Sequence, residues 1–82
     1  MQSYKATEIE ASPIYDGTEQ IVIEIFNPDL NRDLNVDTDM GSFKIKPLST
    51  RLFGAKQISV SVKTGEPIVG TFCIVGCWIT KG

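Results

Sequence analysis

The chain has 82 residues, of which 41% are hydrophobic, and its eight bases and ten acids give a formal net charge of −2. This length is enough for one small domain with a thin core, and this apolar content excludes a disordered chain. We therefore predict a single domain over residues 1–82.

Alternating apolar and polar residues predict strands along most of this domain. In chain order we expect them at residues 4–11, 20–26, 35–38, 42–46, 57–63 and 71–80. A seventh run, residues 48–53, fits the pattern in part. Turns separate these segments, among them Asp16-Gly17 and Val69-Gly70. The last strand is apolar on both faces, which indicates that it lies centrally or has one face against a partner.

Six or seven short strands at this spacing predict an all-β fold, a small β-sandwich of antiparallel strands, with a small OB-like barrel as the alternative. The sandwich is favoured because the two clearest strands differ in how their faces are covered. Residues 57–63 alternate strictly, whereas residues 20–26 carry apolar side chains on both faces.

Neither membrane insertion nor secretion is expected. The apolar stretch at residues 72–79 is shorter than the roughly 20 residues of a membrane helix, and residues 1–5 contain no apolar signal segment. We expect synthesis in the cytoplasm, followed by incorporation into a virion. Cys73 and Cys77 are predicted to be free, buried thiols, because on one strand their Cα atoms lie too far apart for a disulfide.

The composition argues against catalysis. Without histidine there is no Ser-His-Asp or Cys-His pair and no histidine-bound zinc, and no phosphate-binding glycine motif occurs. We therefore predict a protein that is not an enzyme, with no catalytic, cofactor or metal residues. The alternating Asp33, Asn35, Asp37 and Asp39 resemble the start of a calcium loop, but such a loop needs Gly at its sixth and Glu at its twelfth position. Because the sequence has Thr and Lys there, we interpret the four residues as a solvated strand face.

Charge is segregated along the chain. Residues 1–39 carry nine acids and two bases, a net charge of −7, whereas residues 40–65 carry five bases and no acid, a net charge of +5. Three explanations are open: the charges pair between neighbouring strands, the basic face of one copy meets the acidic face of another, or the basic segment binds nucleic acid.

The candidate interface therefore consists of the five bases with two aromatic residues: Lys44, Lys46, Arg51, Phe53, Lys56, Lys63 and Trp78. Trp78 has two interpretations, a core anchor or an interface hot spot near the C-terminus.

Three functions fit these features. The first, which we favour, is a non-enzymatic structural subunit of a bacteriophage or viral particle, such as a minor capsid, decoration or tail-accessory protein. Its partners would be other protein subunits, through self-association or docking on a larger assembly, with no small-molecule substrate. The second is a single-stranded nucleic-acid-binding protein that uses residues 44–63, with Phe43 and Phe53 as stacking platforms. The third is a small inhibitor whose acidic N-terminal half blocks a host protein.

Overall fold

Strands account for all the regular structure of residues 1–77, the part of the chain that the computed structural model describes. They are β1 (Gln2–Ala6), β2 (Ser12–Phe26), β3 (Leu34–Thr38), β4 (Gly41–Ile45), β5 (Thr50–Ser61) and β6 (Ile68–Cys77). Neighbouring strands pair antiparallel in one sheet, in the order β1-β6-β2-β5-β3-β4. The prediction of an all-β fold made of antiparallel strands is confirmed.

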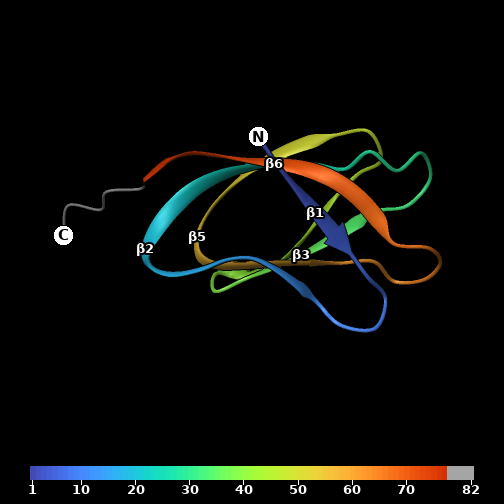
Figure 1. The fold of residues 1–82 in the computed structure, drawn as a ribbon, viewed down its shortest axis with the longest axis horizontal. Helices are drawn as coiled ribbons and strands as arrows, with labels where there is room; N and C mark the ends of the chain where they lie inside the picture. Colours follow the sequence, from blue (N-terminus) through green and yellow to red (C-terminus); the bar gives the residue numbers. More distant parts are fainter. Residues whose placement is uncertain (78–82) are drawn as a thin grey trace.

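The two longest strands bend, so that one continuous sheet forms two facing layers (Figure 1). Residues 21–26 of β2 pair with residues 50–55 of β5, whereas residues 12–16 of β2 pair with residues 57–60. The pairing register shifts between these two blocks, as expected where a strand turns sharply. The upper layer in Figure 1 contains β6 and the first pair of half-strands, and the lower layer contains β3, β4 and the second pair.

Strand β1 connects the two layers. It pairs with β6 along its length, and just beyond its end Thr7 forms a parallel bridge with Ser61 of β5. There the backbone N–H of Val62 donates to the carbonyl oxygen of Thr7 over 3.0 Å. The domain is therefore a single sheet folded over itself rather than two separate sheets, and the hydrogen-bonded contact between Thr7 and the end of β5 joins its two layers. The reason is strand length, because the 15 residues of β2 and the 12 of β5 reach across both layers.

Several predicted boundaries differ from the structure because turn-forming residues lie inside strands. The two predicted segments 48–53 and 57–63 form one strand, β5. Asp16-Gly17, predicted as a turn, lies at the bend of β2. Val69-Gly70, also predicted as a turn, lies within β6, where Gly70 is paired with Tyr4. The end of the predicted strand 71–80 lies outside the described residues.

The core lies between the two layers and is almost entirely aliphatic. The inward face of β2 contributes Ile21, Ile23 and Ile25, which are buried, and their polar or half-buried neighbours face outward. The other core residues are Tyr4, Ala6, Leu34, Val36, Ile45, Phe53, Ala55, Ile58, Val60, Val62, Ile68 and Phe72. Tyr4 is held in this core by its hydroxyl, which donates to the carbonyl oxygen of Phe26 over 2.6 Å, and burial raises its pKa above the usual range.

The loop between β2 and β3 is organised by an ion pair that also reaches a second loop. The Arg32 guanidinium lies 3.0 Å from the Asp29 carboxylate. Its Nη1 atom donates to the backbone oxygens of Thr64 (2.6 Å) and Glu66 (2.8 Å) in the β5–β6 loop. Arg32 therefore fastens two loops that are far apart in the sequence.

Acid is expected to weaken this arrangement. Hydrogen bonds from the Arg32 side chain and from the backbone N–H groups of Asn31 and Arg32 lower the pKa of Asp29 to about 2. Because this pKa is lower in the folded state than in the unfolded state, Asp29 contributes stability that is present above about pH 4 and is lost as the pH falls toward about 2. Urea unfolding across this range should show the loss, and the Asp29→Asn variant should show a shallower decline. An equal decline in both proteins would contradict the assignment.

Two further features of residues 1–77 bear on the sequence predictions. No helix long and apolar enough to cross a membrane occurs in this part of the chain. Cys73 is a free thiol, as predicted, but it is half-buried and not part of the core, because it lies on the outward side of β6. The side chain of Cys77 lies outside the description.

Candidate functional site

Three of the predicted interface bases lie around the β4–β5 turn. Lys44 is on β4, Lys46 follows directly after it, and Arg51 is near the start of β5. All three are exposed, and they line a shallow hollow of about 220 Å³ together with Ile45, Ser49 and Thr50. Arg51 Nη1 also donates to the carbonyl oxygen of Lys44 over 3.3 Å. The β4–β5 turn therefore gathers positive charge at one place.

The two phenylalanines expected to stack with bases lie beneath this positive charge. The rings of Phe43 and Phe53 are 5.6 Å apart, and the Arg51 guanidinium carbon lies 5.1 Å and 5.4 Å from their centres. Phe53 is a core residue with 6% exposure and Phe43 is half-buried. Cation–π contact of this kind stabilises the start of β5. Phe53 is buried and Arg51 lies over the Phe43 ring, an arrangement that does not favour either ring as a platform for a nucleic-acid base.

Two further candidate interface residues, Lys56 and Lys63, do not line the hollow at the β4–β5 turn. Lys56 is exposed on the middle of β5, away from the β4–β5 turn. Lys63 follows β5 and lines a hollow of about 230 Å³ with Lys44, Arg32, Asp33, Asn35 and Thr64. Trp78 lies outside the described residues, so its two interpretations stay open.

The opposite charges of the chain meet as neighbours but do not pair. The acidic strand β3 lies between the strands β4 and β5, which carry the bases. Yet the single ion pair within residues 1–77 is Arg32–Asp29, both from the acidic half. None of the five bases between residues 40 and 65 forms a salt bridge with a described acid. The first explanation of the charge split, ion pairs between neighbouring strands, therefore does not apply to the described bases.

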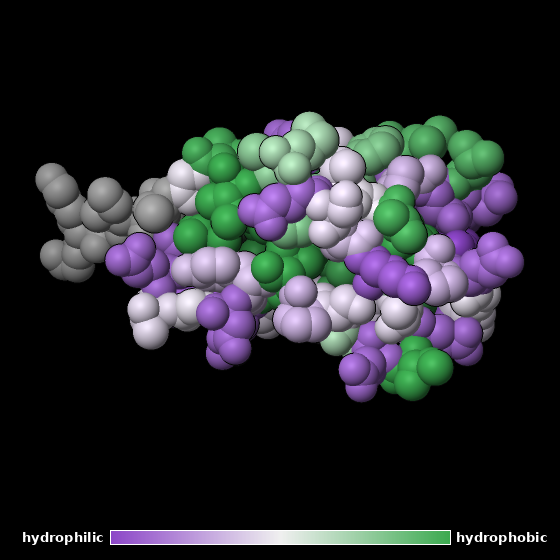
Figure 2. Space-filling view, viewed as in Figure 1, coloured by the Kyte–Doolittle hydropathy of each residue, from purple (hydrophilic) through white to green (hydrophobic). Residues whose placement is uncertain are grey.

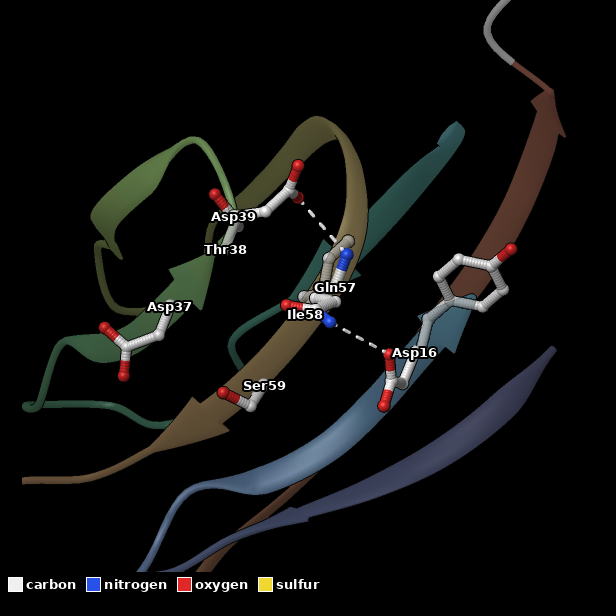
Figure 3. A pocket seen from close by; sticks show the side chains of 8 residues that line it. Asp16, Asp37, Thr38, Asp39, Gln57, Ile58 and Ser59 are labelled. Carbon is white, nitrogen blue, oxygen red and sulfur yellow. Dashed lines mark hydrogen bonds between the residues drawn. The ribbon is translucent and has the colours of Figure 1, made fainter. Parts of the chain in front are cut away.

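An acidic hollow of about 350 Å³ lies on the outward side of the lower layer (Figure 3). Asp39 accepts from the backbone N–H of Lys56 (2.8 Å) and of Gln57 (3.2 Å), and these two bonds lower its pKa. The Gln57 amide in turn donates to Asp16 over 3.2 Å. Asp37 accepts from the Ser42 hydroxyl over 2.7 Å. These carboxylates stabilise the turns around the hollow.

The alternating residues Asp33, Asn35, Asp37 and Asp39 run along one side of β3 and its flanks, where three of them are exposed and Asn35 is half-buried. No group of three metal-binding side chains occurs among the described residues. Their observed hydrogen bonds fit the interpretation of a polar strand face.

The upper layer presents a second and different surface, which we call the outer face: Val22, Glu24, Phe26, Leu52, Val69 and Cys73. The strand register places them on one side, since Glu24 is opposite both Leu52 of β5 and Cys73 of β6. Leu52 is 58% and Val69 63% exposed. In Figure 2 apolar side chains appear along the upper margin, where Figure 1 has β6, the beginning of β5 and, at the right, loops.

A hollow of about 250 Å³ opens on the outer face. It is lined by Met1, Glu24, Phe26, Thr50, Thr71, Phe72 and Cys73. Glu24 carries the one charged side chain of this lining, which also includes the N-terminal residue Met1. Glu24 is exposed and forms no ion pair within residues 1–77. The hollow therefore combines apolar side chains and two threonines with a carboxylate that has no ion-pair partner among the described residues, a combination that suits a partner with an apolar and a cationic group side by side.

Sequence reasoning identified the bases but not the apolar part of this surface. Leu52 lay in the run 48–53, which fitted a strand only in part, so its face could not be assigned. The sequence did contain one indication of this apolar surface: in residues 20–26 the second face of the strand carries Val22 and Phe26 on either side of Glu24.

Comparison with known proteins adds no relationship, because no family model, no curated protein and no solved structure matches this chain.

Proposed function

We propose that this protein is a non-enzymatic structural subunit that docks on other protein subunits through its outer face, within an assembly such as a bacteriophage or viral particle. The observation that carries the proposal is a largely apolar sheet face on which Leu52 and Val69 are more than half exposed. Exposed apolar patches on a regular, rigid surface are typical of protein–protein contacts.

The two edge strands support a face, rather than an edge, as the docking surface. The sheet ends at β1 on one side and at β4 on the other. Exposed lysines lie on both edge strands, Lys5 on β1 and Lys44 on β4. Charged residues on edge strands oppose the addition of a further strand. On the outer face Lys5 lies opposite Val69 at the β1 margin, and Glu24 is the one charged residue farther in, among Val22, Leu52 and Cys73.

The particle setting is supported by the small size of the domain, its all-β fold and its segregated charge. A domain with a thin core gains stability from neighbours that bind its folded form. An assembly offers such neighbours at high local concentration.

The test is a charge placed on the outer face. Burying a leucine at an interface contributes about tenfold or more in affinity, so Leu52→Lys should release the protein from its assembly. Particles from cells that make this protein are separated by density-gradient sedimentation, and the fraction of the protein in the particle band is measured. The matched control is Ile9→Lys, since Ile9 is 95% exposed in the β1–β2 loop, away from the outer face.

Wild type and Ile9→Lys should sediment with the particle, and Leu52→Lys should stay at the top of the gradient with an unchanged circular dichroism spectrum. Wild-type protein found entirely in the unbound fraction would refute docking. Equal incorporation of both lysine variants would refute the outer face as its site.

A further inference from the structure

The β4–β5 turn displays a leucine in a backbone conformation that leucine rarely adopts. The backbone N–H of Ser49 donates to the carbonyl oxygen of Lys46 over 3.2 Å, which closes a four-residue turn. Pro47 occupies the second position and Leu48 the third, with a φ of 58°. A proline followed by a positive φ is the pattern of a type II turn, in which the third position favours glycine. Leu48 is nevertheless there, and its side chain is 58% exposed.

Within the monomer Leu48 makes no buried contact that would explain a leucine at this position. A side chain with a positive φ is strained, and such strain, when it persists, often marks a functional position. The turn itself is held firmly, since the carbonyl oxygen of Ser49 accepts from the backbone N–H of the buried Asn27 over 2.9 Å. Lys46 in the same turn and Arg51 just after it are exposed and have no acidic partner within residues 1–77. The turn thus presents an apolar side chain flanked by unpaired positive charge.

The hollow on the outer face has the complementary character. Its volume of about 250 Å³ accommodates a leucine side chain, its walls include Phe26 and Cys73, and its carboxylate, Glu24, is unpaired. From this complementarity we infer that the β4–β5 turn of one copy docks into the outer-face hollow of a second copy, with Leu48 in the hollow and Lys46 beside Glu24. The inference rests on the proposed function and names a second copy of this chain as the partner.

The position of the two surfaces favours a reciprocal contact. Thr50 lines both the hollow on the outer face and the basic hollow beside the turn. The inserted surface (the β4–β5 turn) and the receiving surface (the outer-face hollow) are therefore adjacent on one molecule. In a two-fold dimer each copy then inserts its own turn into the hollow of the other. The contact needs no pairing of β1 or β4, the lysine-bearing edges.

Sedimentation velocity of the purified full-length chain over a range of concentrations tests this inference. Wild type should dimerise, and Leu48→Gly should weaken dimerisation by about tenfold or more, because the dimer then loses two buried leucines, one from each copy. This variant suits the test because glycine is the favoured residue at this φ, so the monomer should fold at least as well. Leu30→Gly is the matched control, since Leu30 is 73% exposed in a different loop. A monomeric wild type, or equal effects of the two glycine variants, would overturn the inference.

A mixing experiment tests the direction of the contact. Glu24→Lys should prevent the hollow from receiving a turn and leave the β4–β5 turn intact. Leu48→Gly should impair the turn and leave the hollow intact. A mixture of the two variants retains one complete contact, so it should associate more tightly than either variant alone. A mixture no better than its components would overturn the inference. If Leu52→Lys still releases the protein from its assembly in that case, the proposed function stands and its partner is a different protein.

Discussion

Replacement of Asn27 by alanine is expected to destabilise the protein by about 3 kcal/mol or more, as each buried group left without a partner costs about 1–3 kcal/mol. The Asn27 side chain is fully buried. Its amide donates to the carbonyl oxygens of Arg32 and Ile45, each over 2.9 Å, and its carbonyl oxygen accepts from the backbone N–H of Asp29 over 3.0 Å. Alanine would remove all three bonds and leave a cavity, so the loop after β2 would lose its attachment to β4.

The measurement is the midpoint of urea unfolding, compared between variants whose free energy of unfolding falls with urea at the same slope. Asn31→Ala is the matched control, since Asn31 is exposed four positions later and its side chain forms no hydrogen bond with the described residues. Its stability should change by less than about 0.5 kcal/mol. Asn27→Asp should be as damaging as alanine, because a carboxylate oxygen would face two carbonyl oxygens. Equal stabilities of the Asn27→Ala and Asn31→Ala variants would show that the network contributes little.

The second large effect is expected at Gly70, which lies beneath the ring of Tyr4. The two residues are paired across β1 and β6. A methyl group at position 70 would overlap the Tyr4 ring and its hydroxyl. The ring cannot easily move away, because Tyr4 is 5% exposed and its hydroxyl is bonded to the carbonyl oxygen of Phe26. Gly70→Ala should therefore destabilise the protein by about 1–3 kcal/mol, the usual cost of overpacking.

Gly76 provides an internal control on the same strand. A methyl group there would meet no atom within 4 Å, so Gly76→Ala should leave the thermal midpoint close to that of wild type. Tyr4→Ala combined with Gly70→Ala should cost less than the sum of the single changes, because the overlapping ring and hydroxyl are both gone. Strict additivity of the two changes would contradict the assigned clash.

Local pattern alone was sufficient to assign the fold class. The alternation in residues 57–63 and the three isoleucines Ile21, Ile23 and Ile25 identify which side of each strand is buried, because side chains of a strand alternate between its two faces. The segments at 35–38 and 42–46 appear within about one residue of their expected positions, as β3 and β4.

Sequence alone determined less about the candidate site. It identified a basic segment and a last strand apolar on both sides, but it did not show that Lys44, Lys46 and Arg51 lie together. Nor did it indicate that Phe53 is buried beneath Arg51, because burial depends on which strands bend and where. The charge split suggested pairing between strands, whereas the described bases remain unpaired.

The tertiary structure decided the features on which function depends. The bends of β2 and β5 allow one sheet to form both layers around a shared core. A local turn signal, Asp16-Gly17, coincides with the bend of β2, but it did not reveal that the strand continues through the bend into a second layer. The same folding leaves Glu24, Leu52 and Cys73 side by side on an uncovered face, although they are far apart in the sequence. Alternation of apolar and polar residues is a local property, so the sequence shows directly which side of a strand is buried. Which strand faces lie against each other depends on pairing between distant strands, and only the tertiary structure establishes that.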